Sequence, residues 1–110
     1  MEYIKYGKTN LCLILASYKN NGNLYVGLKT KSGEDYSDLT INIPMYMFET
    51  DNEIIINNDN SNELIETLED LNILTDTFKY AYSGYARYKV MNFNKEVAKK
   101  YIKKDYREEN

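Results

Sequence analysis

The sequence predicts an α+β domain, with an antiparallel sheet of about four to six strands and two helices packed on one face. Apolar and polar residues alternate with a period of two from Leu24 to Lys29 and again from Asp38 to Ile43, which is typical of strands. The link between them contains Gly33, a residue suited to a positive-φ turn position, so the two stretches predict a β-hairpin. Apolar residues at helical spacing from Leu64 to Leu71 predict a helix.

We expect this hairpin to be the centre of the core. Alternation places the apolar residues of both strands on one face, where full burial of each contributes roughly 2 kcal/mol. Pro44 donates no ladder hydrogen bond and should end the second strand. The residues expected on the buried face are Leu24, Val26, Leu28, Leu39, Ile41 and Ile43.

Shorter patterns predict the elements before the hairpin. Residues 2–6 predict a short strand that ends at Gly7. Residues 11–16 are apolar throughout, which favours a strand covered on both sides. The turn-forming residues 20–23 should join this strand to the one that begins at Leu24.

After the hairpin, residues 45–48 fit a strand or a loop, and residues 54–56 predict a brief buried strand. Asn60 or Ser61 is suited to cap the predicted helix, which we expect Asn72 to end.

Residues 78–93 predict one or two strands with a break at Gly84. We expect Asn94 to cap a last helix, and residues 106–110 to form a frayed tail. The 110 residues are expected to form a single domain.

Composition restricts the class of protein and its location. With 43% hydrophobic and 28% charged residues the chain is typical of a globular protein. The longest apolar run, residues 11–16, is far shorter than the roughly 20 residues of a membrane span. Residues 1–5 lack the layout of a signal peptide, and the single Cys12 agrees with a reducing compartment. We therefore expect a cytoplasmic protein.

Charge is segregated along the chain. Residues 1–31 carry a net charge of +4 and residues 79–110 a net charge of +5, whereas residues 32–78 contain twelve acids and no lysine or arginine. One interpretation is that the basic ends pair with the acidic middle, as ordinary surface ion pairs. The other is an exposed acidic surface that binds a basic protein, such as a nucleic-acid-handling enzyme. The partner-binding candidates are Glu34, Asp35, Asp38, Glu49, Asp51, Glu53, Glu63, Glu66, Glu69 and Asp70.

An alternative function is single-stranded nucleic-acid binding. Tyrosines interleaved with basic residues can stack on bases over a basic strand, and the lysine-rich last helix could contact phosphate. The other interpretation is that these tyrosines cover the sheet edge with their hydroxyls in water, and the sequence pI of about 5.0 argues against nucleic acid. The candidates for this function are Tyr80, Tyr82, Tyr85, Lys89, Lys99 and Lys103.

No catalytic or metal-binding pattern is present. The chain contains no histidine, the commonest general base, and Cys12 lies in an apolar run where burial makes a thiol unreactive. Residues 51–63 are rich in Asn and Asp but lack the glycine and glutamate spacing of a calcium loop. We expect neither enzyme activity nor a cofactor.

Several short stretches together resemble one known family. They include Asn21-Gly22-Asn23-Leu24, the stretch from Gly33 to Ile43, Leu71-Asn72-Ile73 and Ser83-Gly84-Tyr85. In these stretches the chain resembles the domain of unknown function 4313 family, small proteins of phages and conjugative elements of low-GC Gram-positive bacteria. The resemblance covers most of residues 20–93 and brings no catalytic residues. It implies an accessory protein of a mobile element, a setting rich in small acidic proteins that block host defence nucleases.

Overall fold

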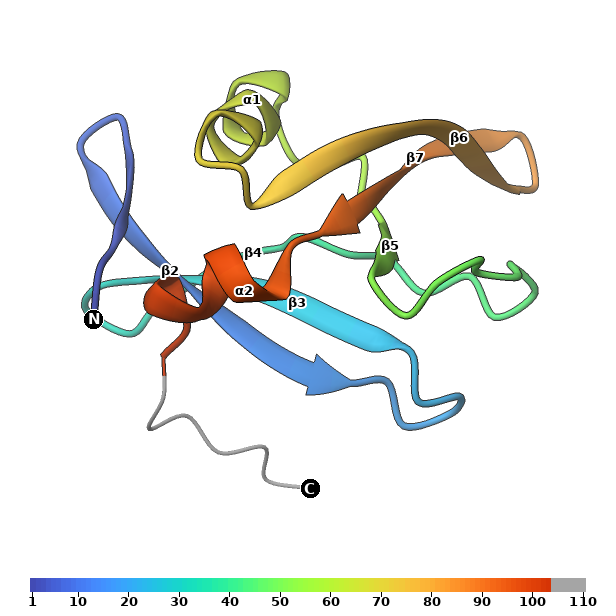
Figure 1. Ribbon diagram of the computed structural model, residues 1–110, viewed down its shortest axis with the longest axis horizontal. Helices are drawn as coiled ribbons and strands as arrows, with labels where there is room; N and C mark the ends of the chain where they lie inside the picture. The colour runs from blue at the N-terminus through green and yellow to red at the C-terminus, as the bar shows by residue number, and fades with distance from the viewer. Residues whose placement is uncertain (104–110) are drawn as a thin grey trace.

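The structure, a computed structural model that describes residues 1–103, confirms the α+β class and the antiparallel pairing (Figure 1). Its seven strands are divided between two sheets, whereas the sequence predicted one sheet of four to six strands. The sheet orders are β1-β2-β3-β4 and β5-β7-β6. The expected frayed tail, residues 106–110, lies outside the described residues.

The first sheet contains the two strands predicted before the central hairpin, β1 and β2, together with the hairpin strands β3 and β4. Its members are β1 (Ile4–Tyr6), β2 (Thr9–Ser17), β3 (Leu24–Thr30) and β4 (Asp35–Asp38), and each pairs antiparallel with the next. Gly33 has a φ of +97° in the turn before β4, as the sequence predicted. The predicted turn at residues 20–23 joins β2 to β3.

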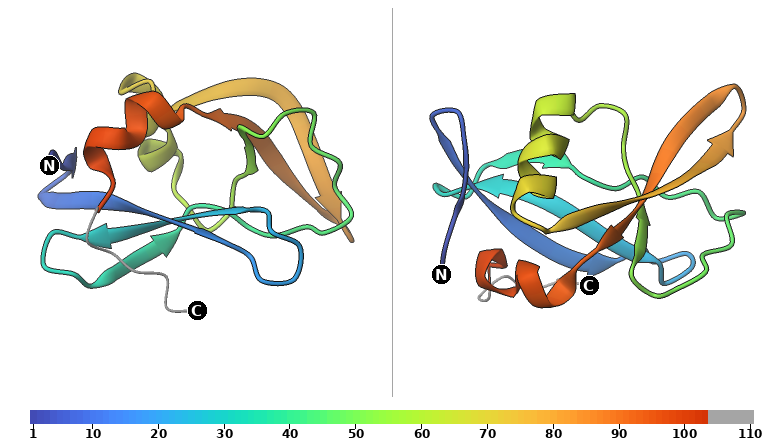
Figure 2. Two further views of the ribbon diagram at one scale, coloured as in Figure 1. Left: turned by 60° about the horizontal axis from the view of Figure 1, so that its bottom comes forward. Right: turned by 45° about the horizontal axis from the view of Figure 1, so that its top comes forward.

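The second sheet contains β5 (Glu53–Ile55), β6 (Leu74–Ser83) and β7 (Ala86–Phe93). The brief buried strand before the helix is therefore confirmed, and so is the break at Gly84, whose φ is +60°. β6 begins four residues earlier than predicted. Figure 2 shows the β6–β7 hairpin extending away from the body of the molecule.

The second strand of the central hairpin was predicted wrongly. β4 ends at Asp38, and the chain then crosses from the first sheet to the second, where the N–H of Ile41 donates to the carbonyl of Ile55 at 3.0 Å. Leu39 consequently packs in the core of the first sheet, whereas Ile41 and Ile43 pack against the second. The alternating residues 39–43 therefore contribute side chains to two different cores, because this segment connects the two sheets.

Helix α1 (Asn62–Asp70) begins as predicted, with the Ser61 hydroxyl accepting the N–H of Leu64 at 3.1 Å. The last helix is shorter than expected: α2 covers Lys95–Ala98 and continues as the 3₁₀ turn η1 (Lys99–Tyr101). Asn94 makes no side-chain cap, because its amide donates instead to the carbonyl of Asn72 at 2.6 Å. No helix within residues 1–103 has the length and apolar character needed to span a membrane.

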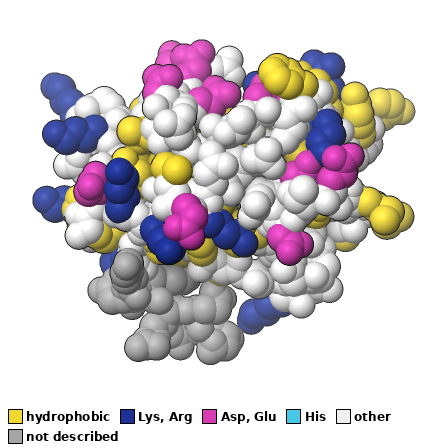
Figure 3. Space-filling model, viewed as in Figure 1, with side chains coloured by type: hydrophobic (Ala, Val, Ile, Leu, Met, Phe, Trp, Pro, Cys, Tyr) yellow, Lys and Arg dark blue, Asp and Glu magenta, His cyan; other side chains and the backbone are white. Residues whose placement is uncertain are grey.

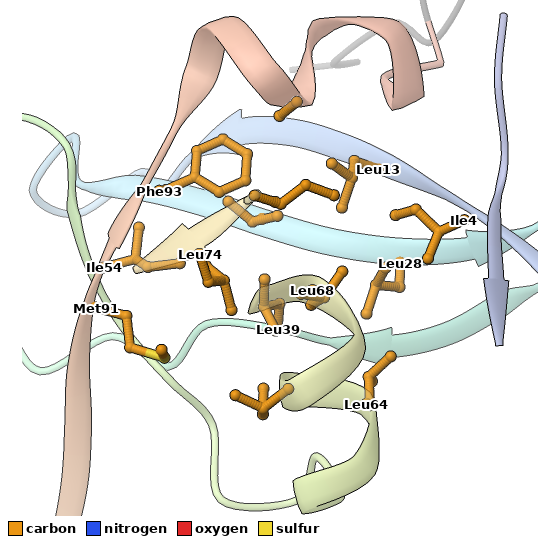
Figure 4. Packing of buried hydrophobic residues seen from close by; sticks show 14 of the residues in the cluster. Ile4, Leu13, Leu28, Leu39, Ile54, Leu64, Leu68, Leu74, Met91 and Phe93 are labelled. Atoms are coloured by element: carbon orange, nitrogen blue, oxygen red, sulfur yellow. The ribbon is translucent and has the colours of Figure 1, made fainter. Parts of the chain in front are cut away.

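The main core lies between the first sheet, the two helices and one end of the second sheet (Figure 4). Both helices contribute side chains to it, so they cover the same face of the first sheet, as predicted. A smaller core lies on the other face of the second sheet. It is formed by Ile43, Ile55, Ala81 and Val90, with Ile41, Tyr46, Phe48 and Tyr88 at its margin.

Candidate interaction surfaces

The outer side of α1 carries the largest group of unpaired acidic residues in the described part of the chain. Glu63, Glu66 and Asp70 are exposed and Glu69 is half-buried, and none of the four forms an ion pair with a residue of the range 1–103. The helix contains no basic residue. Figure 3 shows acidic side chains gathered over this helix. We call these four residues the α1 acidic surface.

A hollow of about 430 Å³ lies between α1 and β7. Glu66 and Glu69 line it from the helix, and Lys89 lines it from the strand. Four asparagines between β5 and the start of α1 complete its polar wall. The structure thus brings two residues of the predicted acidic site beside one residue of the predicted nucleic-acid site.

Other acids of the middle segment pair with the basic ends of the chain. Asp35 forms an ion pair with Lys29 at 2.5 Å, and Asp76 forms one with Lys89 at 3.4 Å. Asp38 accepts a hydrogen bond from the hydroxyl of Tyr25 at 2.6 Å. The middle segment therefore contains acids that pair with the basic ends as well as exposed acids that form no ion pair within residues 1–103.

Glu34 and Asp51 are exposed but lie apart from α1 in the chain fold. Glu34 is in the turn between β3 and β4, and Asp51 is in the turn before β5. Asp51 lines a separate hollow of about 340 Å³ together with Lys95. The predicted acidic residues are therefore distributed over several regions, of which the α1 acidic surface is the most concentrated.

Glu53 does not belong to an exposed surface, which corrects the sequence-based expectation. Only 6% of it is exposed, because it lies on the same face of β5 as Ile55, which packs in the smaller core, and the loop of residues 44–52 covers it. Its carboxylate accepts the N–H of Glu49 at 2.9 Å and forms an ion pair with Lys79. The hydrogen bond to Glu53 raises the pKa of Lys79, and a second ion pair to Glu49 at 3.0 Å adds to the rise. This arrangement holds the loop on the second sheet.

The tyrosines of β6 form one face with basic residues of β7. Tyr80 lies opposite Lys89 and Tyr82 opposite Arg87, and cross-strand partners project on the same side of a sheet. The guanidinium carbon of Arg87 lies 4.3 Å from the centre of the Tyr80 ring, a cation–π contact. Tyr85 stands in the turn and is fully exposed.

The two lysines predicted from the last helix do not join this face. Lys99 pairs with Glu96 at 3.3 Å, and the N–H of Lys103 donates to the carbonyl of Leu13 in β2 at 3.0 Å. They therefore belong to the region over the first sheet, and the predicted nucleic-acid site is only partly assembled.

Sequence reasoning missed three exposed apolar residues. Met45, Met47 and Phe78 are 87%, 85% and 83% exposed, and Figure 3 shows apolar side chains protruding at the hairpin end of the molecule. The exposure of the two methionines could have been predicted from the sequence, because they alternate with Tyr46 and Phe48, which pack on the smaller core. The exposure of Phe78 could not have been predicted from the sequence, because its φ of +62° depends on an irregularity in strand pairing.

Comparison with known proteins gives one result. No curated protein and no solved structure gave a significant match. Residues 12–109 match the family described as "Domain of unknown function (DUF4313)", which covers nearly the whole chain and agrees with the resemblance seen in its short motifs. The chain belongs to the DUF4313 family.

Proposed function

We propose that this protein is a non-enzymatic binding protein whose α1 acidic surface engages a basic partner protein. The observation that carries the proposal is the presence on one nine-residue helix of four carboxylates, none of which forms an ion pair with a residue of the range 1–103. Such a surface attracts a basic protein over a distance and speeds its association.

A nucleic-acid-handling enzyme is the partner that fits this surface best, because its groove is shaped for regularly spaced negative charge. In this proposal the protein is an accessory protein of a mobile element and acts in the cytoplasm. It blocks a host defence nuclease by occupying the groove that holds the nucleic acid.

Affinity capture from the lysate of a low-GC Gram-positive host tests the proposal. We expect a basic protein to be retained at about 0.1 M salt and lost at about 0.5 M salt, where screening is much stronger. The variant Glu63→Lys/Glu66→Lys/Glu69→Lys should lose this protein. Reversal of three exposed acids elsewhere, Glu34→Lys/Asp51→Lys/Asp59→Lys, changes the net charge equally and should retain it.

Two results would contradict the proposal. One is capture that is equal for the α1 variant and the control variant at every salt concentration. The other is the absence of any basic protein from the retained material. Circular dichroism of both variants must show a folded chain, because charge reversal near a helix N-terminus itself costs about 0.3–1 kcal/mol.

Single-stranded nucleic-acid binding is the second candidate function, favoured by the shared face of Tyr80, Tyr82, Arg87 and Lys89. It ranks lower because Glu66 and Glu69 line the same hollow as Lys89 and repel phosphate. Titration of a labelled oligonucleotide decides between the two. A nucleic-acid binder must show affinity that falls as salt rises and is weakened by Tyr82→Ala.

A further inference from the structure

We propose that the chain forms a two-fold symmetric dimer in which β6 pairs antiparallel with β6 of a second copy. β6 is an outer strand of the β5-β7-β6 sheet and has ten residues. The other outer strands of the described chain, β1, β4 and β5, have only three or four residues each. Proteins usually keep exposed edge strands short or interrupt them with a charge, a proline or a bulge, and β6 is the longest outer strand of the described chain.

The backbone of β6 is oriented for such pairing. The carbonyl of Lys89, opposite Tyr80, accepts the N–H of Ile56 at 2.9 Å on the far side of β7. The carbonyl of Arg87, opposite Tyr82, likewise accepts the side-chain amide of Asn58 at 3.0 Å. Tyr80 and Tyr82 therefore occupy non-hydrogen-bonded positions of the β6–β7 ladder, and their own N–H and C=O groups point to the open edge.

The first half of this edge is blocked, which restricts the register. The carboxylate of Asp76 accepts the N–H of Phe78 at 2.8 Å, and Phe78 has a φ of +62° at an irregularity in the strand pairing. Irregularities of this kind protect edges from pairing. Residues 79–83 continue as regular strand up to the turn at Gly84, so a second strand can pair only along this segment.

The open segment is complementary to itself, which identifies a second copy as its partner. With Ala81 on the two-fold axis, Tyr80 of one copy lies opposite Tyr82 of the other. Each such pair exchanges two backbone hydrogen bonds, and the symmetry provides both pairs. Lys79 lies opposite Ser83, so no like charges face each other, and the stacked tyrosines form favourable cross-strand aromatic pairs.

The exposed aromatic area of the hairpin, if wholly buried, equals the lower limit of a standard interface. Phe78, Tyr80, Tyr82 and Tyr85 are 83%, 39%, 65% and fully exposed, and the same register places Phe78 near the turn that holds Tyr85 of the second copy. At roughly 200 Å² for each aromatic side chain, these fractions amount to about 600 Å² per copy. Standard interfaces bury about 600–1,000 Å² per partner. Figure 2 shows the tip of the hairpin extending away from α1 and the first sheet, and the loop of residues 44–52 covers one face of the hairpin.

Light scattering coupled to size-exclusion chromatography tests the dimer. As its concentration rises from about 1 μM to about 100 μM, the wild type should pass from the 13.0 kDa mass of one chain to twice that mass. Tyr82→Lys places a charge on the edge and should give the monomer mass at the same concentrations. Met45→Lys is the matched control, since it adds the same charge at an exposed apolar residue outside β6, and it should remain dimeric.

Hydrogen exchange locates the contact. In the wild type, the amides of Tyr80 and Tyr82 should exchange at least tenfold more slowly at high than at low concentration, whereas in Tyr82→Lys the amide of Tyr80 should exchange rapidly at both. A wild type that has the monomer mass throughout this concentration range would overturn the proposal. So would a dimer that survives both Tyr80→Lys and Tyr82→Lys.

Discussion

The hydroxyl of Tyr25 donates a 2.6 Å hydrogen bond to Oδ1 of Asp38, which ties the first half of β3 to the last residue of β4. Burial raises the pKa of Tyr25 above its ordinary value of 10.0, and the hydrogen bond to Asp38 adds to the rise. The bond lies where the chain leaves the first sheet, so it helps to define where β4 ends.

The raised pKa of Tyr25 predicts a loss of stability in alkaline solution. The folded chain holds the phenol proton more tightly than the unfolded chain, so this stabilisation is complete below pH 10.0 and falls as the pH rises further. We expect Tyr25→Phe to lose less of its free energy of unfolding than the wild type between pH about 10 and about 12. Urea unfolding at a series of pH values measures this difference. Equal alkaline losses in the two proteins would contradict the prediction.

The buried hydroxyl of Thr40 supports the backbone of β3. Its Oγ1 accepts the N–H of the buried Val26 at 3.2 Å and lies 2.9 Å from the hydroxyl of Tyr18. Thr40→Val keeps the shape but leaves that N–H without an acceptor, which should lower the free energy of unfolding by about 1–3 kcal/mol. Thr40→Ser keeps the hydroxyl and is the control. The prediction fails if valine is tolerated as well as serine in denaturant unfolding.

The buried carboxylate of Glu53 should contribute more to stability than its exposed neighbour. Glu53→Gln removes the negative charge that pairs with Lys79 beside the smaller core. Glutamine has the same size as glutamate, so packing is unchanged. Glu49→Gln removes the other partner of Lys79, which is largely exposed, and should change stability by only about 0–1 kcal/mol. Thermal unfolding followed by circular dichroism should therefore show a lower Tm for Glu53→Gln. A lower Tm for Glu49→Gln would refute this ranking.

Asn72 follows α1 in the left-handed conformation, with a φ of +64°. Asparagine and alanine both bring Cβ close to the backbone in this conformation, but the short polar side chain of asparagine compensates by local hydrogen bonding and that of alanine does not. Asn72→Ala should lower the free energy of unfolding by about 1 kcal/mol, and Asn72→Gly should be nearly neutral. Denaturant unfolding of the two variants compares them directly. If alanine and glycine are equivalent, the conformation of residue 72 does not affect stability.

Local patterns predicted most elements because their causes are local. The turn at Gly33 needs a positive φ, the start of α1 needs the Ser61 hydroxyl, and the alternation of β3 needs one buried face. The acidic composition of α1 was equally visible, because α1 is a surface helix whose apolar face alone is buried.

Long-range contacts explain what could not be predicted. Residues 39–43 alternate like a strand, but only the presence of a second sheet makes them a connection between two cores. Glu53 has the sequence context of a surface acid, yet the loop folded over β5 buries it against Lys79. Such contacts depend on residues far apart in the chain.

The sequence by itself determined the fold class, the first three strands of the first sheet with the turns at residues 20–23 and Gly33, the position of α1 and the charge on it. Only the tertiary structure decided that there are two sheets, that the middle acids divide into paired and unpaired groups, and that β6 has an open edge. The physical reason is that capping, turn geometry and periodicity act between near neighbours. Sheet membership and ion pairing instead depend on which distant segments meet.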